Sequence, residues 1–304
     1  LEGVIFVGNI PIPMLRKAQH MTSAFKMDEK NNDWRDSSVP SDRFYDDFDL
    51  QFDFLKQDSV ENNFFYYNLA IKSPQQIQCD IYSARVKAVD SGENPYTQIS
   101  RYFKKVVAEH QTNNKLDQFF SYTGDGSYSN SLTAWTPEAF TIREQMPGIF
   151  DKNGRARFIR YNFSDYPKDD VINMLKRTDL DLSIFHEHGM PERQYLSGSP
   201  ATNRWNTHVD AMKYYYRSLA RRKQDNKKSF NEMLDMMKNT YGLDSIWISG
   251  YDDPKITTED SLLDLRTGII LSEITEFKPN SRIVIFDACY NGDFREKDYV
   301  AGRY

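Results

Sequence analysis

Apolar positions follow two different spacings along this chain. Residues 3–8 (GVIFVG) and 283–287 (IVIFD) are short continuous apolar runs, which are typical of buried strands. Residues 95–111 instead begin with a proline and repeat their apolar positions every three or four residues, which predicts a helix. The face that this helix is expected to bury carries Ile99, Phe103, Val106 and Val107.

Strand-like and helix-like segments alternate over most of the chain. Further strands are predicted within residues 80–86, 116–127, 156–163, 180–189 and 245–249. Helices are predicted over residues 136–146, 167–177, 206–242 (as two helices) and 258–277, and loops over 27–53 and 190–205. This alternation favours an α/β fold whose central sheet is mostly parallel and is flanked by helices.

The composition narrows the class of protein. With 304 residues, the chain is long enough for one large domain or two smaller ones. Its formal net charge of -5 does not suggest a nucleic-acid-binding protein, because such proteins are normally basic. No apolar stretch is long enough to span a bilayer, so we expect no transmembrane segment. The chain opens almost directly on a predicted strand, which suggests a piece excised from a longer precursor.

Two predicted strands end in residues that can carry chemistry. One ends with HEHG (186–189), and the other ends with DAC (287–289). Because the carboxyl ends of parallel strands share one edge of a sheet, we expect a histidine and Cys289 to meet there. A neighbouring imidazole can deprotonate a thiol, and Gly189 and Cys289 can each offer a backbone N–H to a developing oxyanion. The alternative is that Cys289 is an ordinary buried core residue.

The two histidines of this segment are not equivalent. We expect the side chains of His186 and His188 to point to opposite faces of their strand, which disfavours a metal ion shared between them, and no nearby pair of cysteines provides a zinc motif. The adjacent Gly189 favours His188 as the partner of Cys289, which leaves His186 a role in packing or hydrogen bonding. The other cysteine, Cys79, precedes a strand and is expected to be structural, since two cysteines are too few for a disulfide framework.

At these residues the sequence resembles the gingipain family of cysteine peptidases, which has a caspase-like fold. Residues 286–294 (FDACYNGDF) closely resemble the nucleophile segment of that family, and residues 184–189 (IFHEHG) are similar to its His-Gly segment. Weaker similarities follow in the family's order in residues 4–13, 40–45, 80–88 and 98–110. The resemblance covers most of residues 3–295, except the segment between the histidine and the cysteine.

The resemblance implies a role for each residue of the site. Cys289 would be the nucleophile that forms a thioester acyl-enzyme, His188 the general acid and base, and the backbone N–H groups of Gly189 and Cys289 the oxyanion hole. Asp125, in the Gly-rich turn YTGDGS, would be the acidic third member, and the alternative is an ordinary Asp-Gly turn. The resemblance further implies an endopeptidase that acts on proteins or peptides, requires no cofactor, and is secreted or surface-attached in a bacterium.

The resemblance also implies how the chain is divided. Residues 1–110 would form an N-terminal α/β subdomain, and residues 111–304 a caspase-like catalytic subdomain with a helical insertion at about residues 200–260. The family normally continues beyond its cysteine, so we expect the chain to be truncated at its C-terminal end or completed by a second processed chain of the same precursor. The long insertion also fits an alternative, in which the chain is a catalytically degenerate domain that serves as a surface-binding or assembly module.

Two clusters of charged residues leave alternatives open. An acidic cluster in the early loop either binds calcium, which prefers oxygen ligands and is bound by gingipain-like domains, or is simply solvated. A basic cluster in the predicted insertion either forms a solvated helix face or contacts an anionic substrate. The acidic cluster consists of Asp46, Asp47 and Asp49. The basic cluster consists of Arg217, Arg221, Arg222 and Lys223.

Overall fold

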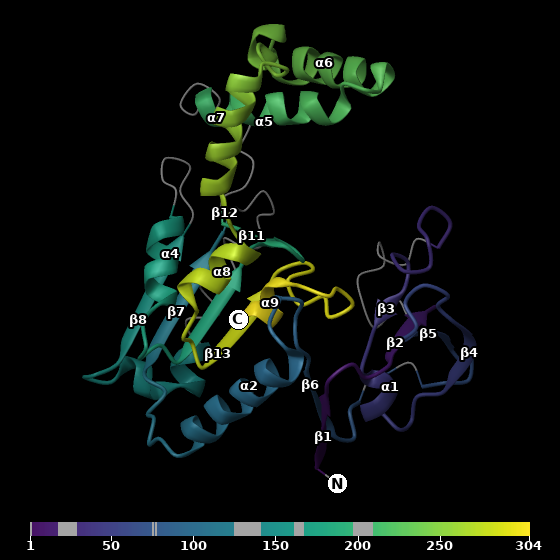
Figure 1. Ribbon diagram of the computed structural model, residues 1–304, viewed down its shortest axis with the longest axis vertical. Coiled ribbons are helices and arrows are strands. Elements are labelled where there is room, and N and C mark those ends of the chain that lie inside the picture. Colours follow the sequence, from purple (N-terminus) through teal and green to yellow (C-terminus); the bar gives the residue numbers. More distant parts are fainter. Residues whose placement is uncertain are drawn as a thin grey trace. The chain divides into compact units, whose positions relative to one another are not determined.

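The computed structural model of the chain divides into two compact units (Figure 1). They comprise Leu1–Thr112 and Asn113–Tyr304, whereas the sequence places the boundary near residue 110. The structure describes residues 2–17, 29–74, 76, 78–124, 141–160, 167–196 and 209–304. Within these ranges, no helix is long and apolar enough to cross a membrane.

The first unit contains two small sheets. In one of them, β1 (Gly3–Val7) and β6 (Tyr82–Val86) run parallel. In the other, the strand order is β3-β2-β5-β4. The strands of this second sheet are β2 (Ile12–Arg16), β3 (Val39–Pro40), β4 (Phe52–Gln57) and β5 (Phe64–Leu69). Every residue of β2 is buried, so this strand lies within the core of the unit.

The first unit also contains α1 (Arg43–Asp46) and α2 (Pro95–His110). The side chain of Asn94 caps α2 by accepting hydrogen bonds from two N–H groups of the first turn, where Pro95 needs no hydrogen-bond acceptor. The helix predicted from the apolar spacing is therefore confirmed. Its expected buried face is only partly buried, since Val107 is 57% exposed.

The second unit is built on a four-stranded parallel sheet of order β13-β9-β7-β8. Its strands are β7 (Gln118–Thr123), β8 (Arg155–Arg160), β9 (Leu182–His186) and β13 (Ile283–Asp287). Although β9 and β13 are far apart in sequence, they are direct neighbours in the sheet (Figure 1). The predicted α/β fold, with a mostly parallel central sheet and flanking helices, is confirmed.

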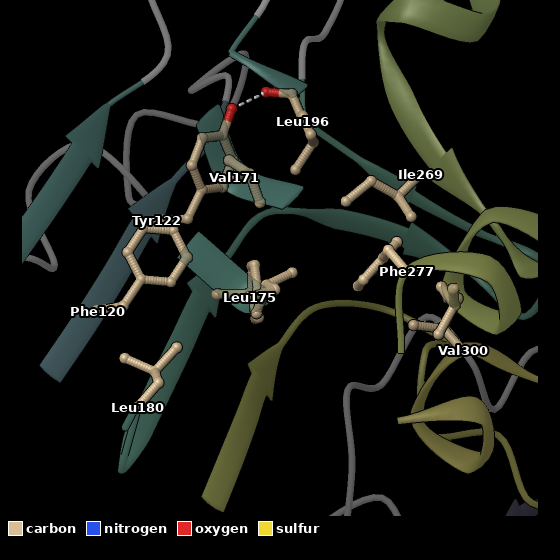
Figure 2. Packing of buried hydrophobic residues seen from close by; sticks show 11 residues of the cluster. Phe120, Tyr122, Val171, Leu175, Leu180, Leu196, Ile269, Phe277 and Val300 are labelled. Atoms are coloured by element: carbon tan, nitrogen blue, oxygen red, sulfur yellow. Dashed lines mark hydrogen bonds between the residues drawn. The ribbon is translucent and has the colours of Figure 1, made fainter. Parts of the chain in front are cut away.

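Helices cover one face of this sheet. They are α4 (Lys168–Leu175), α8 (Leu271–Phe277) and α9 (Val300–Arg303). Figure 2 shows the resulting cluster, in which Phe120 and Tyr122 of β7 pack with Val171, Leu175, Phe277 and Val300. The hydroxyl group of Tyr122 donates a hydrogen bond to the carbonyl of Leu196, which satisfies the polar end of an otherwise apolar side chain.

The described residues cover the opposite face only in part. Leu182 and Ile184 of β9 pack there within a cluster that includes residues from 142–149. Ile283 and Ile285 of β13 lie directly opposite these two residues in the parallel pairing, yet they are 50% and 46% exposed. Among the described strands, β13 is thus an edge strand with two exposed isoleucines on one face.

Between β9 and β13 the chain forms a helical insertion with its own core. The insertion contains α5 (Val209–Lys223), α6 (Lys227–Tyr241), the 3-10 turn η5 (Ser245–Ile248) and α7 (Pro254–Arg266). α5 and α6 lie side by side (Figure 1). The core residues are Met212, Tyr216, Ala220, Met233, Met237, Leu243 and Ile248. The insertion therefore packs around its own apolar residues.

The insertion returns to the central sheet through a small antiparallel sheet of order β10-β11-β12. These strands are β10 (His188–Met190), β11 (Arg193–Tyr195) and β12 (Gly268–Ile270). Arg193 joins this small sheet to α7, because its guanidinium lies 2.5 Å from the carboxylate of Asp264 and donates to the hydroxyl of Thr267 at 2.7 Å.

Several predictions of local structure were wrong. Residues 245–249 form η5 and not a strand. The single helix predicted over residues 258–277 is interrupted by β12, where the absence of a Cβ at Gly268 lets the chain pass close to the backbone of β11. The predicted loop over 27–53 contains β3 and α1, and the predicted loop over 190–205 contains β11.

Candidate active site

The His and Cys segments meet at one edge of the parallel sheet. In the pairing of β9 with β13, His186 lies directly opposite Asp287. The N–H of Glu187 extends this pairing by donating to the carbonyl of Asp287 at 3.3 Å. His188 and Cys289 each follow two residues after the matched pair, so the chain carries both past the same edge. This is the juxtaposition that the two strand ends predict.

Gly189 packs directly against the turn that carries Cys289. A Cβ atom on Gly189 would lie 2.5 Å from the carbonyl oxygen of Cys289 and 2.5 Å from the side-chain amide of Asn291. Non-bonded heavy atoms do not approach that closely, so only glycine allows the two segments to come this near. The backbone next to His188 therefore lies beside the backbone of Cys289.

The turn after Cys289 has an unusual backbone. Tyr290 has a φ of +58°, in the left-handed region that bulky residues rarely adopt. The N–H of Asn291 donates to the carbonyl of Cys289 across this residue, at 2.8 Å. Farther along, the buried carboxylate of Asp293 is paired with Arg295 at 2.6 Å. These contacts hold the backbone around Cys289, which is itself exposed.

His186 makes a hydrogen bond and lies at the end of a broken strand. It is buried, and its Nδ1 lies 3.0 Å from Oδ2 of Asp287, which confirms the expected hydrogen-bonding role. The prediction of opposite faces for His186 and His188 was wrong in its geometry, because residues two apart on a continuous strand share a face. The two histidines instead lie on different strands. β9 ends at His186, Glu187 interrupts the strand, and β10 begins at His188.

His188 is partly buried at the start of β10. Burial disfavours the charged imidazolium and lowers the pKa of His188 below its ordinary value. The ring is therefore neutral at a lower pH than a solvent-exposed histidine. A neutral imidazole is the form that can accept a proton from a thiol.

Glu187, a buried acid between the two histidines, was not predicted from the sequence. Its Oε1 accepts a hydrogen bond from the side chain of Gln194 at 2.7 Å, and Gln194 accepts one from the hydroxyl of Tyr304 at 2.6 Å. Burial raises the pKa of Glu187 well above its ordinary value, because a carboxylate loses more solvation than this hydrogen bond offsets. Alternation along the strand puts Glu187 on the face of the buried Phe185, and this signal would have identified it.

The candidate third member, Asp125, lies outside the described residues. The described residue before it, Gly124, lies beside the His segment: its N–H donates to the carbonyl of His186 at 2.7 Å. A Cβ on Gly124 would lie 3.1 Å from Cβ of Glu187. Part of the helix predicted over residues 136–146 also lies outside the described residues.

The acidic cluster of the first unit is mostly buried. Asp46 forms an ion pair with Arg43 at 2.5 Å, and Asp47 accepts a hydrogen bond from the backbone N–H of Gln78 at 3.0 Å. Only Asp49 is exposed, so the solvated interpretation was wrong for the other two. In the described part of the chain, no group of three or more His, Cys, Asp or Glu side chains is arranged to hold a metal ion.

Two residues of the basic cluster have an internal partner. Arg217 and Arg221 of α5 both contact the buried carboxylate of Asp260 on α7, at 2.5 and 2.7 Å. These contacts join two helices of the insertion, so Arg217 and Arg221 do not form a merely solvated helix face. The contact with an anionic substrate stays a prediction. Cys79, which we expected to be structural, is exposed and provides a second accessible thiol.

Comparisons with known proteins identify no relative. No protein-family model matches the chain, and no significant match is found among curated proteins or solved structures.

Proposed function

We propose that the chain is a cysteine endopeptidase that cleaves peptide bonds through Cys289 and His188. The observation that supports this most directly is the packing of Gly189 against the carbonyl of Cys289, because it joins a histidine segment to an exposed thiol. The two segments lie at the carboxyl edge of a parallel sheet, where open α/β folds usually place their ligand sites. The resemblance of both segments to the gingipain family supports the same function.

The proposed reaction begins with transfer of the Cys289 thiol proton to His188. The thiolate attacks the carbonyl carbon of the scissile peptide bond, and backbone N–H groups of Gly189 and Cys289 stabilise the negative charge on its oxygen. His188 then gives the proton to the leaving amine, and the acyl group remains on Cys289 as a thioester. Water, which His188 deprotonates, hydrolyses the thioester and restores the thiol.

Further properties of the proposal follow from the resemblance. They are a caspase-like fold for the catalytic unit, a protein or peptide as substrate, and a secreted or surface location in a bacterium. Asp125 is the proposed acidic partner of His188. A second processed chain of the same precursor is the proposed partner that completes the substrate pocket. The proposed reaction uses protein groups and water alone, so it requires no cofactor.

The decisive test compares Cys289→Ala with Cys79→Ala as a matched control. Both variants replace an exposed thiol, but only Cys289 lies at the edge of the parallel sheet. We expect Cys289→Ala to abolish cleavage of a peptide library and Cys79→Ala to keep the wild-type rate, with both variants folded by circular dichroism. Cleavage that persists in Cys289→Ala would exclude this residue from the mechanism.

The helical insertion favours a second candidate function, a degenerate domain that binds a partner or assembles on a surface. The insertion has a core of its own, so a large part of the second unit packs separately from the central sheet. The two exposed thiols distinguish the candidates. A catalytic Cys289 reacts with iodoacetamide much faster than Cys79 at neutral pH, because the thiolate is the reactive species. Equal rates would favour the binding module.

A further inference from the structure

We infer that Asn291 is a positioning residue, which holds the turn of Cys289 against the hairpin that carries His188 and Gly189. The inference rests on the proposed function, in which Cys289 and His188 act on the substrate. Asn291 is fully buried, so it affects the reaction through the residues that it holds.

The side chain of Asn291 joins the two segments directly. Its Nδ2 donates to the carbonyl of Met190 at 2.7 Å and to the carbonyl of Arg193 at 2.9 Å. Met190 and Arg193 face each other where β10 turns into β11. Both N–H groups of the amide are therefore used to close the turn of the hairpin.

The backbone of Asn291 holds the other segment. Its N–H donates to the carbonyl of Cys289 at 2.8 Å, and its carbonyl accepts a hydrogen bond from the N–H of Ala301 at 2.9 Å. Tyr290, between these anchored positions, has the left-handed φ of +58°. Such a conformation in a bulky residue persists only where the surrounding contacts fix it. Asn291 supplies those contacts on the side that follows Tyr290.

The chemistry of the position requires an amide. An aspartate has the same shape, but its carboxylate would face two carbonyl oxygens and bury a charge. An alanine would leave the carbonyls of Met190 and Arg193 without these donors in a buried site. Either change would loosen the turn of Cys289 and shift its sulfur relative to the imidazole of His188.

The first experiment measures peptide hydrolysis by Asn291→Ala in the full chain, with Asn291→Ser as a milder variant that carries the test if the alanine variant does not fold. We expect kcat to fall by about 10²-fold with KM nearly unchanged, because a misplacement of about 1 Å at a catalytic group has an effect of this size.

Asn114→Ala is the matched control for this experiment. The side chain of Asn114 also makes two hydrogen bonds, from its Nδ2 to Asp181 at 2.7 Å and from the N–H of Leu116 to its Oδ1 at 2.6 Å. These bonds lie at the opposite end of the same sheet. We expect this variant to keep the wild-type kcat.

The second experiment measures the alkylation of Cys289 by iodoacetamide across pH, with Cys79 in the same chain as the reference thiol. In the wild type, we expect Cys289 to react faster than Cys79 at neutral pH. In Asn291→Ala, we expect the ratio of the two rates to fall toward one and the pH profile of Cys289 to approach that of an isolated thiol. A merely structural role would lower stability and leave this profile unchanged.

The two readouts separate the inference from the proposed function. If the wild type cleaves no peptide and its Cys289 reacts no faster than Cys79, the proposed function is wrong. If the wild type is active but Asn291→Ala keeps its kcat and alkylation profile, the positioning role is wrong and the peptidase function stands. An equal fall of kcat in Asn114→Ala would also overturn the positioning role. A fall in the Asn291 variants alone supports it.

Discussion

The two ends of β9 differ in how they accommodate a buried acid. Asp181, just before the strand, accepts hydrogen bonds from three donors. These donors are the side chain of Asn114 at 2.7 Å, the backbone N–H of Gln118 at 2.8 Å and the guanidinium of Arg282 at 2.8 Å. Glu187, just after the strand, accepts one from Gln194 at 2.7 Å, and its second oxygen has no partner within the described ranges.

This difference suggests that the amino end of β9 serves the stability of the fold and that the carboxyl end serves the candidate site. A buried carboxylate that is fully hydrogen-bonded contributes to a rigid, well-defined fold, and Asp181 is of this kind. At the other end, burial raises the pKa of Glu187, and Tyr290 has a left-handed backbone. Unsatisfied polar groups and unusual dihedral angles are expected where a protein gives up stability for function. The candidate site thus lies at the less stable end of a sheet that is well anchored at the other.

Among the variants that test the difference between the two ends of β9, Gly189→Ala is expected to have the largest effect. It disturbs the carboxyl end alone. The added Cβ would lie 2.5 Å from the carbonyl of Cys289, so the hairpin and the Cys turn must move apart. We expect peptide hydrolysis to fall below detection and the free energy of unfolding to fall by about 1–3 kcal/mol. A peptide assay and urea denaturation measure the two effects.

Gly292→Ala is the matched control. Gly292 belongs to the same turn, but a Cβ there would meet no atom within 4 Å. We therefore expect wild-type hydrolysis and nearly wild-type stability. Similar losses in both glycine variants would contradict a specific contact between Gly189 and Cys289.

Asp181→Ala tests the amino end. It leaves the partly buried N–H of Gln118 and two side-chain donors without their acceptor, so we expect a loss of about 1–3 kcal/mol of unfolding free energy with kcat unchanged. Asp179→Ala is the control, since this exposed acid pairs with Arg177 at 2.7 Å and such surface pairs contribute only about 0–1 kcal/mol. A lower kcat in folded Asp181→Ala protein would show that the two ends are not separable.

Glu187→Gln is expected to have a smaller effect that depends on pH. The pKa of Glu187 is higher in the folded chain than its ordinary value of 4.5. The stability linked to its proton is therefore complete below that pH and is lost as the pH rises toward the folded pKa. Glutamine stays neutral and keeps an oxygen for the amide of Gln194. We expect the variant to become more stable than the wild type with rising pH, by at most about 1.4 kcal/mol per pH unit.

Urea denaturation of the wild type and Glu187→Gln at a series of pH values measures this linkage. A difference in unfolding free energy that does not vary with pH would mean that Glu187 titrates as an ordinary carboxylate, and the contrast with Asp181 would then be lost.

The sheet of the second unit was predictable because its strands have apolar runs that local spacing reveals. The same reasoning failed where contacts between distant segments decide. β2 was not predicted because Pro13 argues against a strand, although the structure buries it in one. The break at Gly268 was missed because helical spacing continues through it, and the approach of β11 is not visible in the local pattern.

The candidate site shows the same limit. The locations of Cys289, His188 and Gly189 followed from the ends of two strands and from the resemblance. The roles of Glu187 and Asn291 did not, because they depend on partners elsewhere in the fold. The hydrogen bond from Asn291 to Met190, for example, joins residues that are 101 positions apart in the chain. Sequence spacing predicts which residues lie at the carboxyl edge of the sheet. Only the folded structure shows which contacts hold those residues in place.

The edge strand β13 affects how the protein behaves in the test tube. Among the described strands, β13 is paired on one side only, with β9, and its free edge, with Ile283 and Ile285 exposed on one face, offers a template on which another β-strand can add. At high protein concentration, molecules would associate through this edge first. A rate measured for Cys289 would then describe aggregates and not single molecules. Rates from dilute, freshly filtered solutions are therefore the ones that describe the chemistry of Cys289.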